Sequence, residues 1–467
     1  MSSNLVIFNV HLVDEELDFN GAVYIENGKI KEIFKGEFPT KGKMLLELAE
    51  KSFSIEETDF YDGNGLHLMP AFIDMHVHLR YPGQTEKEDL KSGLMAAAAG
   101  GVGTLIAMPN TNPVVSSPEI ARTIEEKAKE LNLVNMFQAI SITDAFDGKN
   151  VENIENASRE ITPVITEDGR DVLDSGVMLA AMKKAAKKDI IVSCHSEDPT
   201  LVPLARKFRT VALQKMEEFS IPSWGVDAED RKIPAEENSK IDSMLSEANR
   251  ILAVAEDSYT ERNLLLAEIA KCHVHIAHVS TKNSIDAIRR AKKRTHGKYK
   301  VSCEITPHHL ALCGTFSPEL RALVNPPLRS EEDRLALIEA LKDGTADVIS
   351  TDHAPHTLQD KAKGAPGFSG IEVSYAVCNT VLVKQNGFSE CELSKLMSAQ
   401  AARLLKFEKG RLSVGYDADF VLVNPDEEWT VCGKDFYSKG KATPFEGKKL
   451  FGKVHATFIA GTRVFNA

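Results

Sequence analysis

Between about residues 68 and 407, short apolar segments rich in β-branched residues alternate with longer segments of helical periodicity. We assign eight of the apolar segments to strands, at residues 71–75, 103–108, 135–142, 162–166, 189–194, 273–277, 300–305 and 346–351. Continuous apolar strands are typical of parallel sheets that are buried on both faces. The alternation therefore predicts a closed (β/α)₈ barrel of the TIM type, because an open doubly wound sheet rarely contains so many regular units.

Capping signals predict where two of the intervening helices begin and end. Thr85–Glu88 has the pattern of a capping box, and the periodic segment behind it stops at Gly100 and Gly101. Ser330–Asp333 opens a second helical segment, which closes at Gly344.

The two ends of the chain show short alternating segments separated by turn signals such as Asn27-Gly28. We expect residues 1–66 and 413–467 to form one small β-sandwich domain, built from both termini and lying beside a barrel of residues 67–412. Residues 199–250 are too long and too charged for a barrel loop. They predict a helical insertion near the active-site mouth, either a lid or a subunit contact.

Composition narrows the class of protein. The 467 residues are 43% hydrophobic and 27% charged, with a net charge of −12, which argues against a nucleic-acid surface. No apolar segment reaches membrane-spanning length, and the N-terminus lacks the layout of a signal peptide. The seven cysteines include no Cys-x-x-Cys pair, which favours free thiols in a reducing compartment. We expect a cytoplasmic protein that acts on a small molecule and binds neither nucleic acid nor a membrane.

The most informative stretch for chemistry is Met69–Arg80, an apolar strand that ends in His76, Val77 and His78. Residues two positions apart on a strand point to the same face, so the two imidazoles would project together. Paired imidazoles form half of a zinc-type site. Arg80 follows with the same parity and would face the same pocket.

The other predicted strands also end in polar residues. Functional side chains of such barrels lie at the carboxyl ends of the strands. Those ends carry His76, His78, Asn110, Asp168, His195, His278, Asn325, Asp352 and His356. Four of these histidines and the two aspartates are enough for two metal ions that share an oxygen ligand.

Nine stretches in order along the chain also match the pattern of a known family. They are His76–Gly83, Ala107–Pro113, Glu167–Gly169, His195–Asp198, Ala277–Thr281, Cys303–His309, Val324–Arg329, Ser350–His356 and Gly415–Leu422. In this combination the chain resembles the dihydroorotases of the amidohydrolase superfamily, specifically the long type that is close to hydantoinases and allantoinases.

The resemblance implies a zinc site of one or two ions. It assigns His76, His78 and Asp352 to one ion and His195 and His278 to the other, with Asp168 as the bridge. Many relatives bridge their metals with a carboxylated lysine, but residues 162–166 contain no lysine. The Asp168 carboxylate offers the same negative oxygen ligand.

The activity that the resemblance implies is the reversible cyclisation of N-carbamoyl-L-aspartate to L-dihydroorotate and water, in de novo pyrimidine biosynthesis. A zinc-bound hydroxide would attack the ring amide, with Asp352 as general acid and base. Arg80 would bind the substrate carboxylate through its planar fork, completed by Asn110 and His356. Asn325 would contact the ring amide, and His78 would also touch the substrate.

Three places depart from the family pattern, and at one of them Tyr81 stands where a glutamate is more usual, which we expect to alter only the rim of the pocket. Glu167 and Asp168 stand where two aspartates are usual, and we expect Asp168 to face the site while Glu167 turns outward. The loop Gly364–Phe368 also differs, and no role for it follows from the resemblance.

Two alternatives stay open. One is another cyclic amidohydrolase, such as a hydantoinase, dihydropyrimidinase or allantoinase, because these share the metal ligands. The other is a non-catalytic, dihydroorotase-like scaffold subunit. A homodimer, or association with another enzyme of the pyrimidine pathway, is compatible with either.

Overall fold

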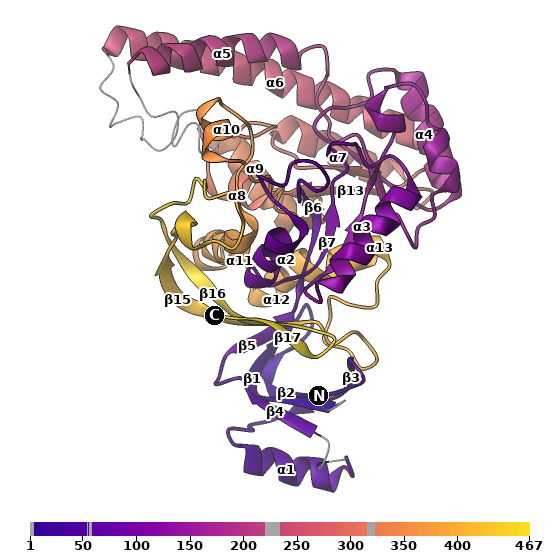
Figure 1. Ribbon diagram of the computed structural model, residues 1–467, viewed down its shortest axis with the longest axis vertical. Coiled ribbons are helices and arrows are strands. Elements are labelled where there is room, and N and C mark those ends of the chain that lie inside the picture. The colour runs from indigo at the N-terminus through magenta and orange to yellow at the C-terminus, as the bar shows by residue number, and fades with distance from the viewer. Residues whose placement is uncertain (1–3, 54, 56–57, 220–233, 315–322) are drawn as a thin grey trace.

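A parallel barrel occupies the centre of the computed structural model, which describes residues 4–53, 55, 58–219, 234–314 and 323–467. A sheet made from the two ends of the chain lies at one end of the barrel (Figure 1). Two long helices, α5 (Val202–Glu218) and α6 (Ala235–Ala270), lie across the opposite end.

All eight predicted barrel strands are present. They are β6 (Phe72–Val77), β7 (Val102–Ala107), β8 (Asn135–Gln138) continued by β9 (Ile140–Ser141), β10 (Val164–Thr166), β11 (Ile191–Cys194), β12 (Val274–Ile276), β13 (Val301–Ile305) and β14 (Val348–Ile349). Neighbouring strands pair in parallel. A parallel bridge between Val77 and His353 joins the last strand to the first, and His78 N donates to His353 O at 2.8 Å. The prediction of a closed barrel is confirmed.

Helices follow most of the barrel strands. They are α2 (Leu90–Ala99), α3 (Pro118–Glu130), α4 (Ser175–Lys187), α6, α7 (Lys282–Arg294), α8 (Pro307–Ala311), α9 (Glu331–Lys342) and α10 (Leu358–Ala362). After β9, two short turns, η1 (Asp144–Phe146) and η2 (Glu152–Asn156), replace the helix. The chain then continues through η4 (Ile371–Val373), α11 (Ser374–Cys378), η5 (Asn379–Gln385), α12 (Glu390–Ser394), η6 (Lys395–Ala399) and α13 (Gln400–Leu405). Of these, η6 and α13 pack on the barrel strand β6.

One predicted helix start is correct and the other is wrong. Ser330 caps α9 and forms a capping box with Asp333, as predicted. Helix α2, however, begins at Leu90, with Asp89 as its cap. Glu88 is fully buried and accepts a hydrogen bond from Ser438 Oγ at 2.5 Å. Ser438, which is distant in the sequence, therefore binds the Glu88 side chain that the capping-box pattern had assigned to the helix start.

The terminal sheet contains β1 (Asn4–Val13), β2 (Asp18–Glu26), β3 (Lys29–Lys35), β4 (Thr58–Asp62), β5 (His67–Pro70), β15 (Phe420–Thr430), β16 (Lys449–Ile459) and β17 (Thr462–Asn466). Its order is β17-β16-β15-β5-β1-β2-β3, and β4 pairs with β1. The two ends of the chain thus form one separate sheet unit, as predicted. The expected boundary after residue 66 precedes β5, which pairs within this sheet.

Two apolar clusters hold the sheet together. Side chains from both ends of the chain, including Leu12 of β1 and Phe458 of β16, meet in one buried cluster. Helix α1 (Lys41–Glu50) packs Met44 and Leu48 into a second cluster formed with β1, β2 and β3. Between β15 and β16 the short turn η7 (Gly433–Asp435) leads the chain back toward the barrel.

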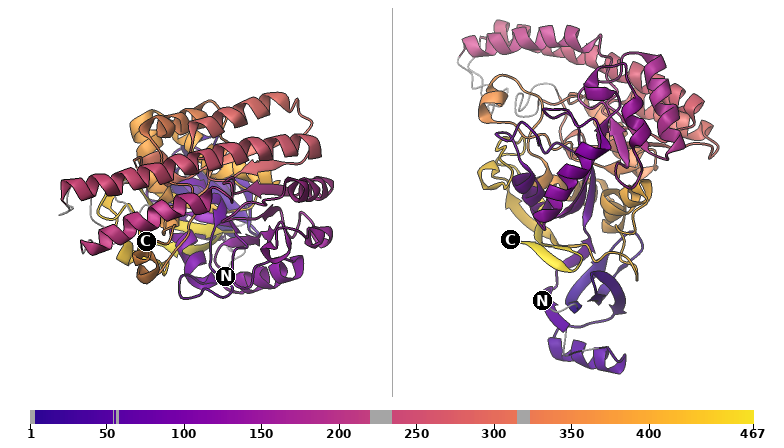
Figure 2. Two further views of the ribbon diagram at one scale, coloured as in Figure 1. Left: turned by 90° about the horizontal axis from the view of Figure 1, so that it is seen from above. Right: turned by 45° about the vertical axis from the view of Figure 1, so that its right-hand side comes forward.

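The described parts of residues 199–250 form α5 and the start of α6, while residues 220–233 lie outside the described ranges. Helix α5 packs on α6 through small apolar residues such as Ala205, Ala212 and Ala248. Figure 2 shows the pair from above, running side by side across the barrel. Helix α6 continues past residue 250 and leads into β12, so it also serves as a barrel helix.

All seven cysteines are unpaired. Among the helices that the structure describes, none is both long enough and apolar enough to cross a bilayer.

Candidate active site

The carboxyl ends of the barrel strands bring the expected metal ligands together. Potential ligand atoms of His76, His78 and Asp168 all lie within 4.8 Å of one another, as do those of Asp168, His195 and His278. All five side chains are buried. Two groups of donors therefore meet at a shared aspartate.

Asp168 occupies the centre of this arrangement. Its Oδ1 lies 3.3 Å from His76 Nε2 and 3.3 Å from His195 Nδ1. Its Oδ2 lies 3.3 Å from His78 Nε2, while His278 Nε2 is 3.8 Å from Oδ1. The carboxylate thus faces histidines of both groups, as a bridging ligand must.

Asp352 lies beside the first group. Its Oδ1 is 3.1 Å from His78 Nε2 and 3.6 Å from His76 Nε2. The preceding strand end is tied to β6, because Thr351 donates through its backbone N and Oγ1 to the buried Asp74, at 3.1 and 2.6 Å. The hydrogen bonds between Thr351 and Asp74, where the last barrel strand meets the first, therefore hold Asp352 next to His76 and His78.

Three of the four imidazoles are oriented by a second hydrogen bond. Outside the cluster, His76 Nδ1 lies 2.7 Å from Glu304 Oε1, and His195 Nε2 lies 2.9 Å from Glu197 Oε2. His78 Nδ1 lies 2.9 Å from Asn110 Oδ1, and Asn110 Nδ2 donates to Asp168 at 3.1 Å. Such partners fix the tautomer and aim the other ring nitrogen at a metal.

The electrostatics of the site favour ionised carboxylates. Burial alone would raise the pKa of Asp168, but the imidazoles of His76, His195 and His278 hold it well below its ordinary value. For Asp352, burial is likewise outweighed by the hydrogen bond from His78, which lowers its pKa to about 2. Burial lowers the pKa of His76, yet Asp168 and Glu304 raise it well above its usual range. The pocket is thus built to hold positive charge.

The donor set fits a pair of divalent cations. His76 Nε2 is buried and has no hydrogen-bond partner within the described ranges, although it points at both aspartates. Buried polar atoms are normally satisfied, and a cation would satisfy this one. Imidazole nitrogens combined with carboxylate oxygens suit zinc-type ions, and binding would displace the imidazolium proton.

Three residues of the site have a left-handed backbone conformation. The φ angles of Arg80, His278 and Asp352 are 56°, 32° and 49°. Residues other than glycine rarely adopt such values, and they tend to cluster at active sites, where the surrounding structure enforces them. The backbone at these three strand ends is therefore shaped by the site rather than by local preference.

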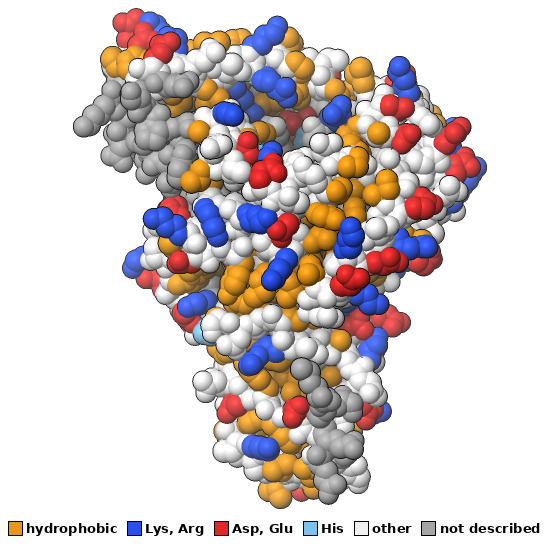
Figure 3. Space-filling model, viewed as in Figure 1, with side chains coloured by type: hydrophobic (Ala, Val, Ile, Leu, Met, Phe, Trp, Pro, Cys, Tyr) orange, Lys and Arg blue, Asp and Glu red, His pale blue; other side chains and the backbone are white. Residues whose placement is uncertain are grey.

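A pocket of about 260 Å³ opens beside the cluster. Its lining includes His78, Arg80, Asn110, Asp168, His195, Arg206, His278, Asn325, Asp352, His356, Pro366 and Gly367. In Figure 3 a hollow with histidine at its floor lies below the α5–α6 pair. The expected metal and substrate residues, except the deeper His76, thus share one small pocket, together with the loop 364–368.

Arg80 is buried and held by two acceptors. Its Nε donates to Pro355 O at 3.2 Å, and its Nη2 donates to His356 Nε2 at 3.1 Å. Burial and the neighbouring Arg80 lower the pKa of His356 to about 3. His356 is therefore a neutral acceptor for Arg80 at physiological pH.

Sequence reasoning missed several residues that support this site. Glu304 contacts both His76 and His275; it lies in the matching stretch Cys303–His309 and is a carboxylate inside the apolar strand β13, but no role followed from either signal. Glu197, which binds His195, lies in the matching stretch His195–Asp198, but no role followed from it. Arg209 of α5, which donates to Asn325, gave no sequence signal. Glu167 turns away, as expected, because its carboxylate accepts hydrogen bonds from Thr143.

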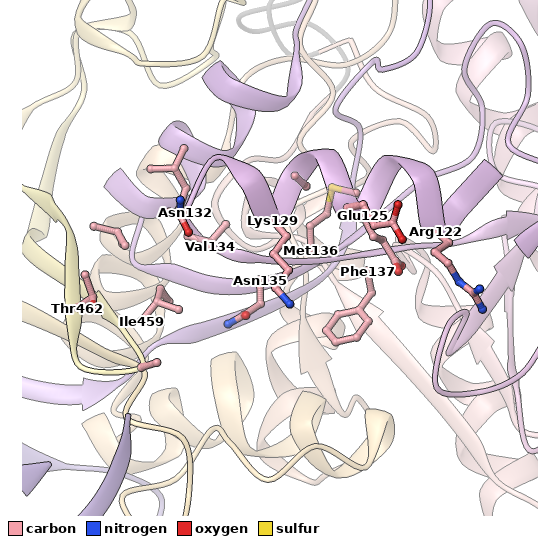
Figure 4. Close-up of a pocket in the computed structure, with 15 residues that line it drawn as sticks. Arg122, Glu125, Lys129, Asn132, Val134, Asn135, Met136, Phe137, Ile459 and Thr462 are labelled. Carbon is pink, nitrogen blue, oxygen red and sulfur yellow. The ribbon is translucent and has the colours of Figure 1, made fainter. Parts of the chain in front are cut away.

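A larger pocket, of about 670 Å³, lies elsewhere on the molecule. Figure 4 shows it between α3, β8 and the β16–β17 turn, where Lys129, Asn135 and Thr462 line it. It contains none of the histidines or aspartates described above. Size alone therefore does not mark the site of chemistry in this protein.

Comparison with known proteins agrees with this geometry. Residues 65–206 match the family model of dihydro-orotase-like proteins, and residues 232–464 match that of the amidohydrolase family. A dihydroorotase from Clostridium botulinum is 38% identical over 458 residues, which cover 98% of both chains. A dihydroorotase from Bacillus cytotoxicus is 37% identical and covers 89% of this chain and 91% of its own.

Solved structures of similar fold bear the names of neighbouring enzymes. An L-hydantoinase (dihydropyrimidinase) from Arthrobacter aurescens superposes with a TM-score of 0.79 at 22% identity, covering 99% of this chain and 96% of its own. A dihydropyrimidinase from Brevibacillus agri gives a TM-score of 0.76, also at 22% identity, with 99% and 95% covered. At this identity the likeness establishes the barrel-and-sheet fold. The near full-length matches show that the chain belongs to the dihydroorotase family of the amidohydrolases, hydrolases of cyclic amide C–N bonds.

Proposed function

We propose that this protein is a zinc-dependent dihydroorotase, which interconverts N-carbamoyl-L-aspartate and L-dihydroorotate plus water in pyrimidine biosynthesis. The observation that carries the proposal is the presence of Arg80 in the same small pocket as the His/Asp cluster. A metal-supported amide hydrolysis needs the cluster, and a ring that bears a carboxylate needs the buried arginine.

Asp352 is the proposed acid and base. A zinc pair, when bound by His76, His78, Asp168, His195, His278 and Asp352, supplies a nucleophile from water at neutral pH and polarises the ring carbonyl. In hydrolysis Asp352 accepts the proton of the attacking water and passes it to the departing ring nitrogen. In the biosynthetic direction Asp352 takes the proton from the ureido nitrogen and returns it as water leaves. Its lowered pKa keeps Asp352 ionised at neutral pH.

The substrate carboxylate is assigned to Arg80. The guanidinium already donates to Pro355 and His356, so its orientation is set before substrate binds. Asn110 lines the same pocket, and its side chain bridges His78 and Asp168. The proposed carboxylate clamp therefore lines the same pocket as an asparagine that is hydrogen-bonded to two of the proposed metal ligands.

A direct assay separates the proposed substrate from the rivals. Purified protein is offered dihydroorotate, hydantoin, dihydrouracil and allantoin in parallel, with ring opening followed by absorbance. We expect the highest kcat/KM with dihydroorotate, because the other three rings carry no carboxylate for Arg80. Preference for one of those three would contradict the proposed substrate. No turnover of any ring by metal-loaded protein would support the scaffold alternative.

The identity of the metal, the assembly and the location are further parts of the proposal. Zinc is expected at one or two ions per chain, measured by elemental analysis, and removal by a chelator should abolish activity until zinc is returned. We further propose that the enzyme works in the cytoplasm, in keeping with its seven free thiols, as a homodimer or beside another pathway enzyme. Sedimentation of the purified protein, and co-purification from its source, test the assembly.

A further inference from the structure

The helical insertion reaches into the active site through two arginines of α5. Arg206 lines the pocket beside the metal cluster. Arg209, one helical turn further on, donates from Nη1 to Asn325 Oδ1 at 2.8 Å. Burial lowers the pKa of Arg209 to about 10, so its guanidinium stays protonated at neutral pH.

The contact between Arg209 and Asn325 fixes which way the Asn325 amide points. A guanidinium has only donors, so the atom of Asn325 that faces it must be the carbonyl oxygen. The other end of the amide, Nδ2, is then the group that Asn325 offers to its remaining surroundings, and Asn325 itself lines the substrate pocket. An unrestrained asparagine could present either a donor or an acceptor to a ring. Here the contact with Arg209 occupies the carbonyl oxygen and so favours the donor.

The two partners are held by a common framework. Helix α5 packs on α6 through Ala212 and Ile241, and Leu323 packs against the same cluster. Arg329, which follows Asn325 on the chain, donates to Asn249 O and Leu252 O of α6 at 2.9 and 3.2 Å. Its Nη2 also pairs with the buried Glu256 of α6 at 3.0 Å. The segment that carries Asn325 and the helix that carries Arg209 are therefore both fastened to α6.

We propose that Arg209 is a positioning residue that makes Asn325 a hydrogen-bond donor to the substrate, so that the insertion takes part in substrate selection. The inference rests on the dihydroorotase activity proposed above. A substrate must then present an acceptor, a ring carbonyl oxygen or the ureido oxygen of the open form, at Asn325. A ring that presents an N–H there leaves two donors facing each other, and the site rejects it.

The test is a double-mutant cycle on the metal-loaded enzyme, with dihydroorotate as substrate. Arg209→Met removes the guanidinium while keeping the stem, and Asn325→Ala removes the amide. We expect each single variant to raise KM about tenfold, with a smaller change in kcat. Because Arg209 acts through Asn325, adding Arg209→Met to Asn325→Ala should change KM less than about twofold. Lys207→Met, an exposed neighbour on α5, is the matched control and should behave as wild type.

A second variant tests the donor without altering Arg209. Asn325→Asp has nearly the same shape and keeps an acceptor for Arg209, but it has no N–H for the substrate. We expect its KM to rise as far as that of Asn325→Ala, with an unchanged Tm. A wild-type KM in Asn325→Asp, or a full Arg209→Met effect in the Asn325→Ala background, would overturn the inference. Wild-type turnover of dihydroorotate reports separately on the proposed function, so the two failures are distinguishable.

Discussion

Arg80 Nη2 donates a hydrogen bond to His356 Nε2 across 3.1 Å, and both side chains are buried in the wall of the substrate pocket. The direction of this bond follows from chemistry, because arginine can only donate and the imidazole nitrogen must therefore be unprotonated. His356 acts on Arg80 as an acceptor that sets the plane of the guanidinium. Under the proposed function, the two residues would bind the substrate carboxylate as one unit.

Arg80→Lys tests this unit. Lysine keeps the charge but loses the planar fork and the bond to His356, so we expect KM for dihydroorotate to rise about 10- to 100-fold with a smaller loss of kcat. Steady-state kinetics on both substrates measure the change. Arg122→Lys, at an exposed position on α3, is the matched control. Equal kinetics for Arg80→Lys and wild type would remove Arg80 from the substrate site.

We expect His356 to stay unprotonated at neutral pH while it accepts the hydrogen bond from Arg80. Its pKa is lowered to about 3, below the 6.5 of an ordinary histidine, so the folded state favours the neutral ring. The stabilising effect of the neutral ring is present above pH 6.5 and is lost as the pH falls toward 3. His356→Phe removes the acceptor and should raise KM about tenfold, whereas His356→Gln keeps an acceptor and should retain more affinity. Equal KM values for the two variants would contradict the acceptor role.

We expect Glu304 to control metal affinity through its contact with the proposed ligand His76. Its two carboxylate oxygens lie 2.7 Å from His76 Nδ1 and 3.1 Å from His275 Nε2. Glu304→Gln removes the charge that orients His76, and we expect metal affinity to fall about 10- to 100-fold. Competition with a chromogenic chelator measures this affinity independently of turnover. Glu339→Gln, on the exposed face of α9, should leave it unchanged, and an unchanged affinity in Glu304→Gln would refute the assignment.

Lys361 should make stability depend on pH above neutrality. Its ammonium is fully buried and donates to Ala365 O and Gly367 O at 2.8 Å each, which holds the loop that lines the pocket. Burial lowers its pKa from 10.5 to about 7. Between these two values the unfolded chain binds more protons than the folded one, so stability rises with pH in that window.

Lys361→Met should lack this contribution. Denaturant unfolding of both proteins at several pH values from 6.5 to 10 measures it, and we expect wild type to gain stability relative to the variant as the pH rises. Each unit of the pKa shift corresponds to about 1.4 kcal/mol. Lys363→Met, exposed two residues away, should follow the wild-type pH profile. Parallel profiles for wild type and Lys361→Met would show that the buried amine does not titrate in this range.

Much of the fold could be read from local patterns. The barrel strands are apolar because both of their faces are buried, so their positions and number follow from hydrophobicity. Ser330 caps α9 because a capping box is a contact within one turn. The helix start predicted at Thr85–Glu88 was wrong because the deciding contact is not local. Ser438, far along the chain, binds Glu88 in the core, and α2 starts later, at Leu90.

The candidate metal ligands were also visible in the chain, since each is the polar residue that ends an apolar strand and all strand ends of a barrel meet on one side. What the chain alone could not reveal were the partners that orient these side chains. Glu304 behind His76, and Arg209 behind Asn325, act across gaps of more than a hundred residues, and no local pattern encodes such contacts. The order of motifs thus determined the fold family and the reactive groups. Only tertiary packing decided their tautomers, amide orientations and charge states, because these depend on which distant donor or acceptor lies within about 3 Å.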